Sequence, residues 1–441
     1  MRRLGHATVL GAGTMGAQIA AHLANAGVPC LLLDVTAQAA RDGLERARRL
    51  RPDPFFTPDT HRLITTGAFE TDLPAVARSD WIIEAIVERL DAKRDLYARL
   101  EAHLGAGAIV SSNTSGIPIA ALGEGRSERF RRHFLGTHFF NPPRYLPLLE
   151  VIPSADTDPA VVDTVRVIAD HRLGKSVVVA KDTPGFIGNR IALFGVARLL
   201  AMLERGWTIE EIDAVTGAPL GRPKSATFRT MDLAGLDILV HVANDLAARL
   251  SEAERDAFRL PAFVHELVRR GWTGEKAGRG FYRRASQEEG GGLLVLDPAT
   301  LEYRPSRPVT LPAIEAARAI EDPGDRIRTL FLGRDRVGEL LRLTLGPSLL
   351  YAARVAPDIA HSIDDIDRAM RWGFGWELGP FETWDAVGLE EVLRACAAEA
   401  PLLVRARLDE SARTGAPAAF RPLEPDRSAV APRRYRLVPP A

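Results

Sequence analysis

The stretch that decides the fold is residues 6–23, which read His6-Ala-Thr-Val-Leu-Gly11-Ala-Gly13-Thr-Met-Gly16-Ala-Gln-Ile-Ala-Ala-His-Leu. An apolar strand is followed by a G-x-G-x-x-G turn, an amphipathic helix and, about 20 residues after the turn, the carboxylate of Asp34. This order is typical of a dinucleotide-binding βαβ unit. In such a unit Gly11 permits the tight turn, Gly13 allows a pyrophosphate to approach the backbone, and Gly16 allows the helix to pack closely on the strand. The alternative is a glycine-rich turn that binds nothing.

Asp34 predicts which dinucleotide is bound. Its carboxylate would accept hydrogen bonds from the adenosine ribose hydroxyls, whereas a 2′-phosphate in that place would face a like charge. The next residues, Val35-Thr36, include no arginine that could receive such a phosphate. We therefore expect NAD rather than NADP, held by Gly11, Gly13, Thr14, Met15, Gly16 and Asp34.

The composition excludes several classes of partner. The 441 residues include 57 basic and 57 acidic side chains, so the formal net charge is zero and nothing attracts the chain to nucleic acid or an anionic membrane. We find no apolar run long enough to cross a bilayer, and the glycine turn interrupts the only run that resembles a signal peptide. Two cysteines, Cys30 and Cys396, are too few for a disulfide framework. We expect a cytoplasmic protein with no metal.

Strand-like runs alternate with helical patterns as far as Ala180, which is typical of a doubly wound parallel sheet. Residues 51–75 are rich in proline at their start and are expected to form a loop-rich excursion. After Lys181 the apolar period becomes helical, which predicts a domain boundary near residue 183. The expected strands are Ala7–Leu10, Cys30–Leu33, Trp81–Ala85, Ile109–Ser112, Phe134–Phe139, Leu148–Ile152 and Val177–Ala180.

The second half of the chain contains a repeat. Thr208-Ile-Glu-Glu-Ile-Asp213 recurs as Ser362-Ile-Asp-Asp-Ile-Asp367, and Met231-Asp-Leu-Ala-Gly-Leu236 recurs as Trp384-Asp-Ala-Val-Gly-Leu389. The Ser/Thr-x-x-Asp/Glu openings are capping boxes, so the repeat predicts equivalent helices in two homologous all-α domains. The predicted fold is an α/β Rossmann-type domain followed by these two domains. The expected division is 1–183 for NAD binding, 184–284 for the first helical domain, 285–325 for a linker, 326–405 for the second helical copy and 406–441 for an irregular tail.

Polar residues that could perform chemistry lie at the ends of predicted strands. Ser111-Ser-Asn-Thr-Ser-Gly116 follows one strand at its carboxyl end, where doubly wound folds bind ligands. Glu150 lies in the apolar run Leu148–Ile152, and an unpaired buried carboxylate is costly, so we expect it to pair with His138. Such a pair holds the imidazole in one tautomer and suits general acid–base catalysis. A histidine such as His138, read alone, is more often a hydrogen-bonded residue of the core, but its pairing with Glu150 beside a dinucleotide fold favours a role in catalysis.

Six blocks taken together resemble the L-3-hydroxyacyl-CoA dehydrogenases of fatty acid β-oxidation, over about residues 1–405. The two helical copies are similar to the duplicated C-terminal domain of the long, bifunctional members, which are usually fused to an enoyl-CoA hydratase. No room for a hydratase is left, so we expect a free-standing dehydrogenase or the dehydrogenase portion of a larger protein. The blocks are Gly11-Ala-Gly-Thr-Met-Gly16, Glu84-Ala-Ile-Val-Glu88, Ser112-Asn-Thr-Ser115, His138-Phe-Phe-Asn-Pro142, Leu149-Glu-Val-Ile152 and Lys181-Asp-Thr-Pro-Gly-Phe-Ile-Gly-Asn-Arg190.

The resemblance implies NAD-dependent oxidation of an L-3-hydroxyacyl-CoA to the 3-ketoacyl-CoA. It implies that His138 is the general base, that Glu150 orients it, and that Ser115 hydrogen-bonds the reacting oxygen. Asn189 matches an asparagine that contacts the substrate. The further contacts to NAD that it implies are made by Glu88, Lys93 and Asn113. One departure is Gly116, where the family often has a second serine or a threonine.

Several alternatives stay open. Ser115 could cap the next helix, Lys93 could be a solvated helix residue, and the arginines within 41–51 could form a solvated face rather than grip CoA phosphates. The chain could oxidise a free hydroxy acid, or bind NAD(H) without catalysis. A related family that uses a lysine base is disfavoured because residues 111–150 contain none.

The resemblance also bears on partners and on the roles of the two helical copies. The expected partners are an acyl-CoA thioester and an enoyl-CoA hydratase or thiolase, and both a monomer and a homodimer fit. We expect the two helical copies to pack on each other, the first completing the substrate cleft and residues 330–405 acting mainly as support.

Overall fold

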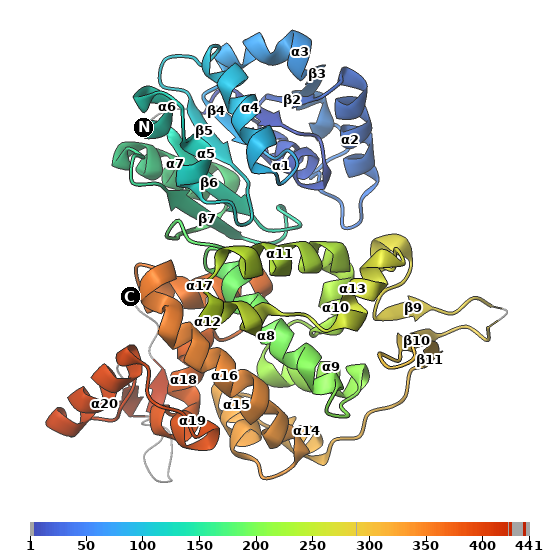
Figure 1. The fold of residues 1–441 in the computed structure, drawn as a ribbon, viewed down its shortest axis with the longest axis vertical. Helices are drawn as coiled ribbons and strands as arrows, with labels where there is room; N and C mark the ends of the chain where they lie inside the picture. Colours follow the sequence, from blue (N-terminus) through green and yellow to red (C-terminus); the bar gives the residue numbers. More distant parts are fainter. Residues whose placement is uncertain (1–3, 288, 422, 426–434, 438–441) are drawn as a thin grey trace. The chain divides into compact units, whose positions relative to one another are not determined.

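The computed structural model describes residues 4–287, 289–421, 423–425 and 435–437. It divides into two compact units (Figure 1). Unit 1 comprises Met1–Ile187 together with Asp358–His361, and unit 2 comprises Gly188–Pro357 together with Ser362–Ala441. No helix among the described residues is both long enough and apolar enough to cross a bilayer.

Unit 1 is built on an eight-stranded sheet in the order β3-β2-β1-β4-β5-β6-β7-β8. Neighbouring strands are parallel except for β6 and β7, which are antiparallel. The strand order reverses between β1 and β4, and a doubly wound sheet binds its ligand at such a point, beyond the carboxyl ends of the strands. The strands are β1 (Ala7–Leu10), β2 (Cys30–Asp34), β3 (Ile64–Ala68), β4 (Trp81–Glu84), β5 (Ile109–Ser112), β6 (Phe134–Phe139), β7 (Leu148–Pro153) and β8 (Ser176–Val179).

Strand β3 corrects the expectation of a wholly loop-rich segment over 51–75. It pairs in parallel with β2, with Leu33 opposite Gly67, and forms an edge of the sheet. Its sequence, Ile-Thr-Thr-Gly-Ala, is short and only partly apolar, so it has little of the pattern that predicts a strand. The helices of unit 1 are α1 (Thr14–Asn25), α2 (Ala37–Arg49), α3 (Phe69–Asp72), α4 (Leu90–Glu101), α5 (Ile119–Gly123), α6 (Glu128–Arg132) and α7 (Pro159–Leu173).

The short segment Asp358–His361 belongs to unit 1 although it lies far along the chain. Ala360 forms an antiparallel bridge with Ala180, and the Lys181 amide donates to the carbonyl of Ile359 at 3.0 Å. This segment lies inside the range 326–405 that was expected to form the second helical copy. The predicted division into domains otherwise remains a prediction.

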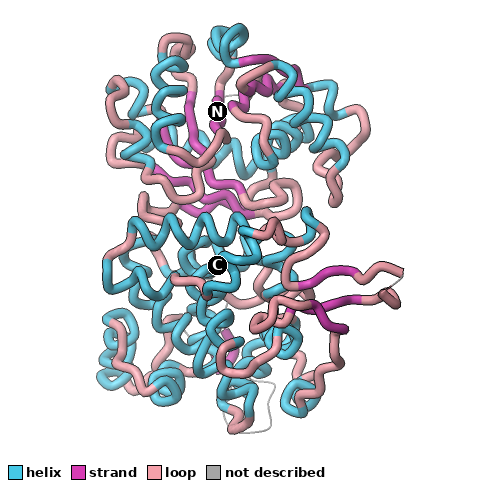
Figure 2. The backbone as a smooth tube through the Cα atoms, turned by 45° about the vertical axis from the view of Figure 1, so that its right-hand side comes forward, coloured by secondary structure: helices cyan, strands magenta, loops and turns pink. Residues whose placement is uncertain are grey.

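Unit 2 is mainly helical (Figure 2). We call α8 to α13 together with β9 (Tyr282–Arg284) the first copy. We call α16 to α20 together with the residues that follow as far as Arg421 the second copy. The first copy contains α8 (Gly188–Leu203), α9 (Ile209–Thr216), α10 (Phe228–Ala234), α11 (Leu236–Arg249), α12 (Glu252–Arg255) and α13 (Ala262–Arg269). The second contains α16 (Arg336–Ile359), α17 (Ile363–Phe374), α18 (Pro380–Val387), α19 (Leu389–Cys396) and α20 (Leu402–Thr414).

The repeat seen in the sequence forms equivalent structure in the two copies. Thr208 and Ser362 are the N-cap residues of α9 and α17, and both form the predicted capping boxes. Helices α10 and α18 end at Gly235 and Gly388, whose φ angles are 105° and 104°. Positive φ is costly for a residue with a Cβ, so the recurring glycine is explained by the backbone it must adopt.

The segment 285–325 is more ordered than the expected linker. Residues within and just before it form a three-stranded antiparallel sheet of β9 (Tyr282–Arg284), β10 (Leu293–Leu296) and β11 (Tyr303–Pro305), which extends from the helices of unit 2 (Figure 2). Two helices follow, α14 (Pro312–Ala317) and α15 (Pro323–Leu332). Alternation in Leu293–Leu296 is weak because the strand is a continuous apolar run, which hid it between glycines and prolines.

The expected irregular tail, 406–441, is also corrected in part. Helix α20 continues to Thr414, and two short strands, β12 (Leu423–Pro425) and β13 (Tyr435–Leu437), pair in antiparallel fashion. The amides of Phe420 and Arg421 donate to the carboxylate of Asp385. The prediction for residues 422, 426–434 and 438–441 lies outside the described residues.

Candidate active site

The glycine turn after β1 has the geometry that its sequence predicts. Gly11 has a φ of 103°, and a Cβ there would lie 2.6 Å from the Ala85 carbonyl oxygen. A Cβ on Gly16 would lie 1.9 Å from the Gly11 carbonyl oxygen, so only glycine allows α1 to pack this closely. Gly13, the N-cap residue of α1, has no atom within 4 Å of its Cβ position. The backbone is therefore open at the helix N-terminus, where a pyrophosphate would bind.

Asp34 lies at the end of β2, beside this turn. Its Oδ2 accepts a hydrogen bond from the Ala12 amide and its Oδ1 accepts one from the Val35 amide, both at 2.7 Å. The side chain is only partly buried. Two backbone amides thus hold an accessible carboxylate next to the glycine turn. A carboxylate acceptor for the ribose hydroxyls beside an open helix N-terminus for the pyrophosphate fits a dinucleotide. Thr14 and Met15 begin α1 at the same place.

Lys93 and Glu88 belong to a buried network instead of a solvated surface. Lys93 is 1% exposed, and its Nζ lies 2.6 Å from Glu84 Oε1 and 3.1 Å from Glu88 Oε2. Burial disfavours the Lys93 ammonium, but the two carboxylates outweigh burial and raise its pKa. Glu88 in turn accepts hydrogen bonds from the Ser115 amide and the Thr114 hydroxyl. The alternative of a solvated Lys93 is therefore wrong.

Glu84 is the centre of this network, and the sequence reasoning did not select it as a site residue. It ends β4 completely buried, and it accepts hydrogen bonds at 2.6 Å from Lys93, from the Tyr97 hydroxyl and from Ser112 Oγ. The Ile86 amide is a fourth donor, at 2.7 Å. The signal was present in Trp81-Ile-Ile-Glu84, a carboxylate in an apolar run. The same argument had selected Glu150.

The antiparallel pairing of β6 with β7 brings His138 and Glu150 together. They are directly opposite each other in β6 and β7, and His138 Nδ1 lies 2.7 Å from Glu150 Oε2. Their exposed fractions are 5% and 0%. Glu150 Oε1 accepts a further hydrogen bond from the Ile187 amide at 3.1 Å. The carboxylate therefore holds Nδ1 as the N–H nitrogen and leaves Nε2 as the proton acceptor.

Aromatic rings fix the plane of the imidazole. The His138 ring lies 4.6 Å from the ring of Phe140 and 5.8 Å from that of Phe186. Phe186 is completely buried and has a φ of 48°, which is rare for a bulky residue. Strain of this kind persists only where the surroundings impose it, and it is concentrated at functional sites. The sequence reasoning did not select Phe186 and Ile187 as site residues, although they directly follow Asp-Thr-Pro-Gly in the block Lys181–Arg190 given above.

Ser115 and Asn113 lie in the turn that follows β5. Ser115 does not cap the next helix, because the N-cap residue of α5 is Pro118 and the amides of Ile119 and Ala120 donate to Asp182. Asn113 Oδ1 accepts from the amide of Phe139, so this turn is tied to the residue after His138. These contacts place the Ser115 turn beside β6 within unit 1.

Asn189 lies in unit 2, in the first turn of α8. It lines an apolar cavity among the helices there. Its predicted contact with the substrate stays a prediction.

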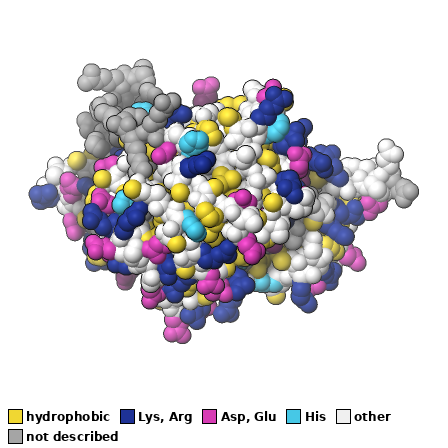
Figure 3. Space-filling model, turned by 90° about the horizontal axis from the view of Figure 1, so that it is seen from above, with side chains coloured by type: hydrophobic (Ala, Val, Ile, Leu, Met, Phe, Trp, Pro, Cys, Tyr) yellow, Lys and Arg dark blue, Asp and Glu magenta, His cyan; other side chains and the backbone are white. Residues whose placement is uncertain are grey.

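The arginines of α2 were considered above as a site for the phosphates of CoA. Arg41, Arg46, Arg48 and Arg49 are exposed on α2, and Arg48 pairs with Glu45, which favours the solvated face. Basic and acidic side chains are interspersed on the face shown in Figure 3. Within the described ranges, no group of three His, Cys, Asp or Glu side chains could hold a metal ion.

Comparison with known proteins identifies the family of this chain. Residues 6–183 match the model of the 3-hydroxyacyl-CoA dehydrogenase NAD-binding domain, and residues 185–284 and 343–418 match that of the C-terminal domain. The solved structure of 3-hydroxybutyryl-CoA dehydrogenase from Escherichia coli K12 is similar in fold, with a TM-score of 0.64 and 23% identity. That similarity covers 89% of this chain and 94% of the other.

Two curated relatives are named probable 3-hydroxyacyl-CoA dehydrogenase. The one from Bacillus subtilis is 42% identical over 92% of this chain, which spans 54% of that relative's length. The one from Deinococcus radiodurans is 50% identical over 64% of this chain and 84% of its own. Unit 1 is thus an NAD-binding domain, and the chain belongs to the 3-hydroxyacyl-CoA dehydrogenase family.

Proposed function

We propose that the protein catalyses the NAD-dependent oxidation of an L-3-hydroxyacyl-CoA to the 3-ketoacyl-CoA. The observation that carries this proposal is the buried His138–Glu150 pair, with 2.7 Å between Nδ1 and Oε2, in the same unit as the glycine turn and Asp34. Membership of the family supports the thioester as the substrate class.

In this reaction the C3–O–H group becomes a carbonyl by losing a proton from oxygen and a hydride from carbon. His138 Nε2 takes the hydroxyl proton, and Glu150 stabilises the imidazolium that forms. In this proposal Ser115 hydrogen-bonds the reacting oxygen, and Asn189 contacts the substrate. When bound, NAD accepts the hydride. The burial of Glu150 strengthens its interaction with the imidazolium, because little water competes.

The first prediction tests the base. With NADH and acetoacetyl-CoA the reaction runs in reverse and His138 returns the proton, so His138→Gln should lower kcat by about 10²- to 10⁴-fold while NADH still binds, since a positioned general acid–base group contributes that much. Because His138 and Glu150 act as one unit, the variant that also carries Glu150→Gln should lose much less than the product of the two single losses. Stopped-flow oxidation of NADH measures turnover, and fluorescence titration measures NADH binding.

His171→Gln is the matched control, because His171 is exposed on α7. Near-normal turnover of His138→Gln would show that another group is the base. Turnover of a free keto acid but not of acetoacetyl-CoA would support the alternative hydroxy acid enzyme, and NADH binding without any turnover would support a non-catalytic protein.

The second prediction tests the dinucleotide. Asp34→Ala should raise KM for NAD more than KM for NADP, because the ribose acceptor and the charge that repels a 2′-phosphate are removed together. Equal use of both cofactors by the unmodified protein would contradict the role given to Asp34. Glu45→Ala, an exposed carboxylate on α2, is the control.

The fatty acid β-oxidation pathway and its partners are part of the same proposal. Oxidation of a 3-hydroxyacyl-CoA follows hydration of an enoyl-CoA and precedes thiolytic cleavage, so a hydratase or thiolase is the expected neighbour. Co-purification from the native source, followed by assays for both activities, tests this association.

A further inference from the structure

The β6–β7 loop, residues 140–147, joins the two strands that carry His138 and Glu150 (Figure 1). It contains no helix or strand, and three of its residues are prolines. Proline has no amide hydrogen, so the loop has few donors of its own for its carbonyl oxygens. The ring of Phe140, its first residue, lies 4.6 Å from the ring of His138. The position of this loop therefore bears directly on the imidazole.

Lys175 is a buried residue that contacts this loop. It lies between α7 and β8, and its side chain is 2% exposed. Its Nζ donates hydrogen bonds to the carbonyl of Pro143 and, at 2.8 Å, to the carbonyl of Leu146. The Nζ also lies over the ring of Phe139, 5.7 Å from its centroid, and the face of an aromatic ring attracts a cation. The ammonium thus binds the loop at two points and lies over the ring of the residue after His138.

Two further side chains hold the loop from its outer side. The Arg144 guanidinium and the Tyr145 hydroxyl both donate to the carbonyl of Asp53, at 2.6 Å and 2.9 Å. Tyr145 is 46% exposed, so water competes for these hydrogen bonds. Water is excluded around Lys175, where a hydrogen bond is electrostatically stronger. The buried ammonium is therefore the firmer of the two attachments.

Lys175 has no carboxylate within ion-pair distance among the described residues, and burial lowers its pKa to about 8. The charged and titratable groups that face it are Arg144 on the loop and His22 on α1. Burial and then the charge of Lys175 lower the pKa of His22 to about 4, so His22 is neutral near pH 7. Stability alone does not explain the lysine, because an apolar side chain of this length would avoid the cost of burying a charge.

We propose that Lys175 is a positioning residue for the dehydrogenase reaction, whose ammonium holds the β6–β7 loop and thereby keeps the ring of Phe140 against His138. The inference rests on the proposed function, because that function assigns the proton transfer to His138. All of the residues involved lie in unit 1. A neutral amine would hold the loop less firmly, since hydrogen bonds from an ionised donor are about twice as strong as neutral ones. We therefore expect full turnover only while Lys175 carries its charge.

Turnover is measured in the direction that oxidises 3-hydroxybutyryl-CoA with NAD. Lys175→Met removes both hydrogen bonds to the loop and keeps an unbranched side chain of similar length. Its kcat should fall by about 10- to 100-fold while NADH binding stays unchanged, since a misplacement of about 1 Å costs up to that much. Arg166→Met, at an exposed arginine of α7, is the matched control and should leave kcat unchanged.

The pH profile of kcat distinguishes positioning from a general loss of stability. His138 acts as the base in this direction, so its own ionisation raises kcat with pH and produces no alkaline decline. Lys175 has a pKa of about 8, so kcat of the unmodified protein should fall by up to about tenfold from its plateau at about pH 9. Lys175→Arg keeps its charge at every pH of the assay and should show a high kcat without this decline. Lys175→Met should show a low kcat without it.

Amide hydrogen exchange tests the hold on the loop without any turnover. The amides of Tyr145 and Leu146 donate to the Pro142 carbonyl within the loop, so they exchange when the loop opens. Exchange about tenfold faster in Lys175→Met than in Arg166→Met is expected, because a hydrogen bond from a charged group contributes about that factor. This result would support the hold on the loop even if the protein oxidised no hydroxyacyl-CoA.

Three results would overturn the inference. They are exchange in folded Lys175→Met equal to that of the control, a kcat equal to that of the control, and an alkaline decline of kcat that persists in this variant. Each of them would leave the oxidation of 3-hydroxybutyryl-CoA by the unmodified protein intact, so the proposed function would stand.

Discussion

The two helical copies share a backbone frame but close it with different chemistry. In the first copy Asp213 accepts hydrogen bonds from the amides that begin α10, and Asp232 accepts from the amides of Phe281 and Tyr282. In the second copy Asp367 and Asp385 do the same for α18 and for Phe420 and Arg421. The repeat thus continues into the residues after α20, beyond the part that the sequence pattern showed.

The difference lies in the side chain that meets the first aspartate. Tyr282 donates its hydroxyl to Asp213 at 2.8 Å, whereas Arg421 presents its guanidinium to Asp364, Asp367 and Asp385. The frame therefore depends on the aspartates, which satisfy backbone amides, and the closing group is free to be neutral or charged. A neutral group such as the Tyr282 hydroxyl adds one hydrogen bond to the stability of the fold. A buried cation such as Arg421 neutralises the surrounding carboxylates, so its removal would leave buried charges without a partner.

The largest predicted effect comes from replacing the residue that meets the first aspartate, which is Arg421 in the second copy and Tyr282 in the first. Arg421→Ala should lower the free energy of unfolding of unit 2 by about 3–5 kcal/mol, because the buried carboxylates of Asp367 and Asp385 lose their counter-charge. Tyr282→Phe should cost only about 1 kcal/mol, the value of one hydrogen bond. Urea denaturation followed by tryptophan fluorescence measures both. Arg394→Ala, at an exposed arginine of α19, is the control, and equal losses at Arg421 and Tyr282 would show that charge does not distinguish the copies.

A smaller effect concerns pH and should be shared by the copies. Burial raises the pKa of Asp232 to about 6 and that of Asp385 to about 6. The folded state therefore binds the proton more tightly, so the stability this contributes is complete below about pH 4 and is lost as the pH rises through about 6. Asp232→Asn does not titrate, so its deficit relative to the unmodified protein should shrink by up to about 3 kcal/mol between those limits.

The pH measurement is a series of urea titrations from about pH 4 to about pH 7. The stability deficit of Asp385→Asn should also shrink as the pH rises. A deficit that grows with pH in either variant would mean that hydrogen bonds to the ionised carboxylate outweigh burial.

The smallest predicted effect sharpens the likeness of the copies at their first helices. Thr208→Ala and Ser362→Ala each remove an N-cap acceptor of α9 or α17, and each should cost about 1 kcal/mol. Thr164→Ala, at a partly exposed threonine inside α7, removes a hydroxyl that caps no helix and should cost less. A loss at only one of the two caps would show that the capping boxes are not equivalent in energy.

The sequence alone determined the features that depend on neighbouring residues. The G-x-G-x-x-G turn, the capping boxes and the recurring glycines specify backbone conformations within a few residues, so their patterns could be interpreted directly. The pairing of His138 with Glu150 followed from one further argument, the cost of burying a charge without a partner. The same argument would have selected Glu84.

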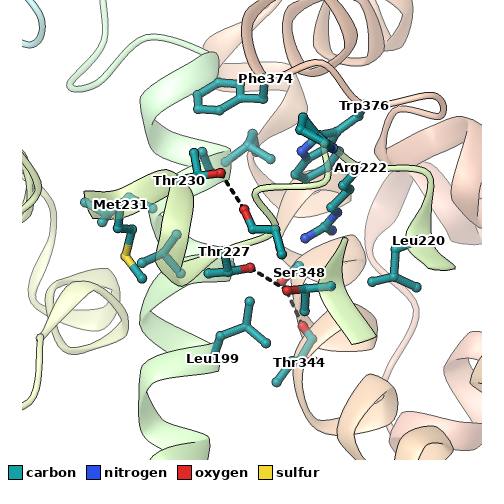
Figure 4. Close-up of a pocket in the computed structure, with 18 of the residues that line it drawn as sticks. Leu199, Leu220, Arg222, Thr227, Thr230, Met231, Thr344, Ser348, Phe374 and Trp376 are labelled. Atoms are coloured by element: carbon teal, nitrogen blue, oxygen red, sulfur yellow. Dashed lines mark hydrogen bonds between the residues drawn. The ribbon is translucent and has the colours of Figure 1, made fainter. Parts of the chain in front are cut away.

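Only the tertiary structure decided the features that join distant parts of the chain. Strand β3 forms because β2 offers it an edge, and Lys93 is buried because Glu84 and Glu88 surround it. Arg421 completes the second copy from beyond α20, and the apolar cavity of unit 2 exists only where α8 and α11 meet α16 (Figure 4). Packing between residues far apart in sequence leaves no local pattern, because each segment contributes only one side of a contact.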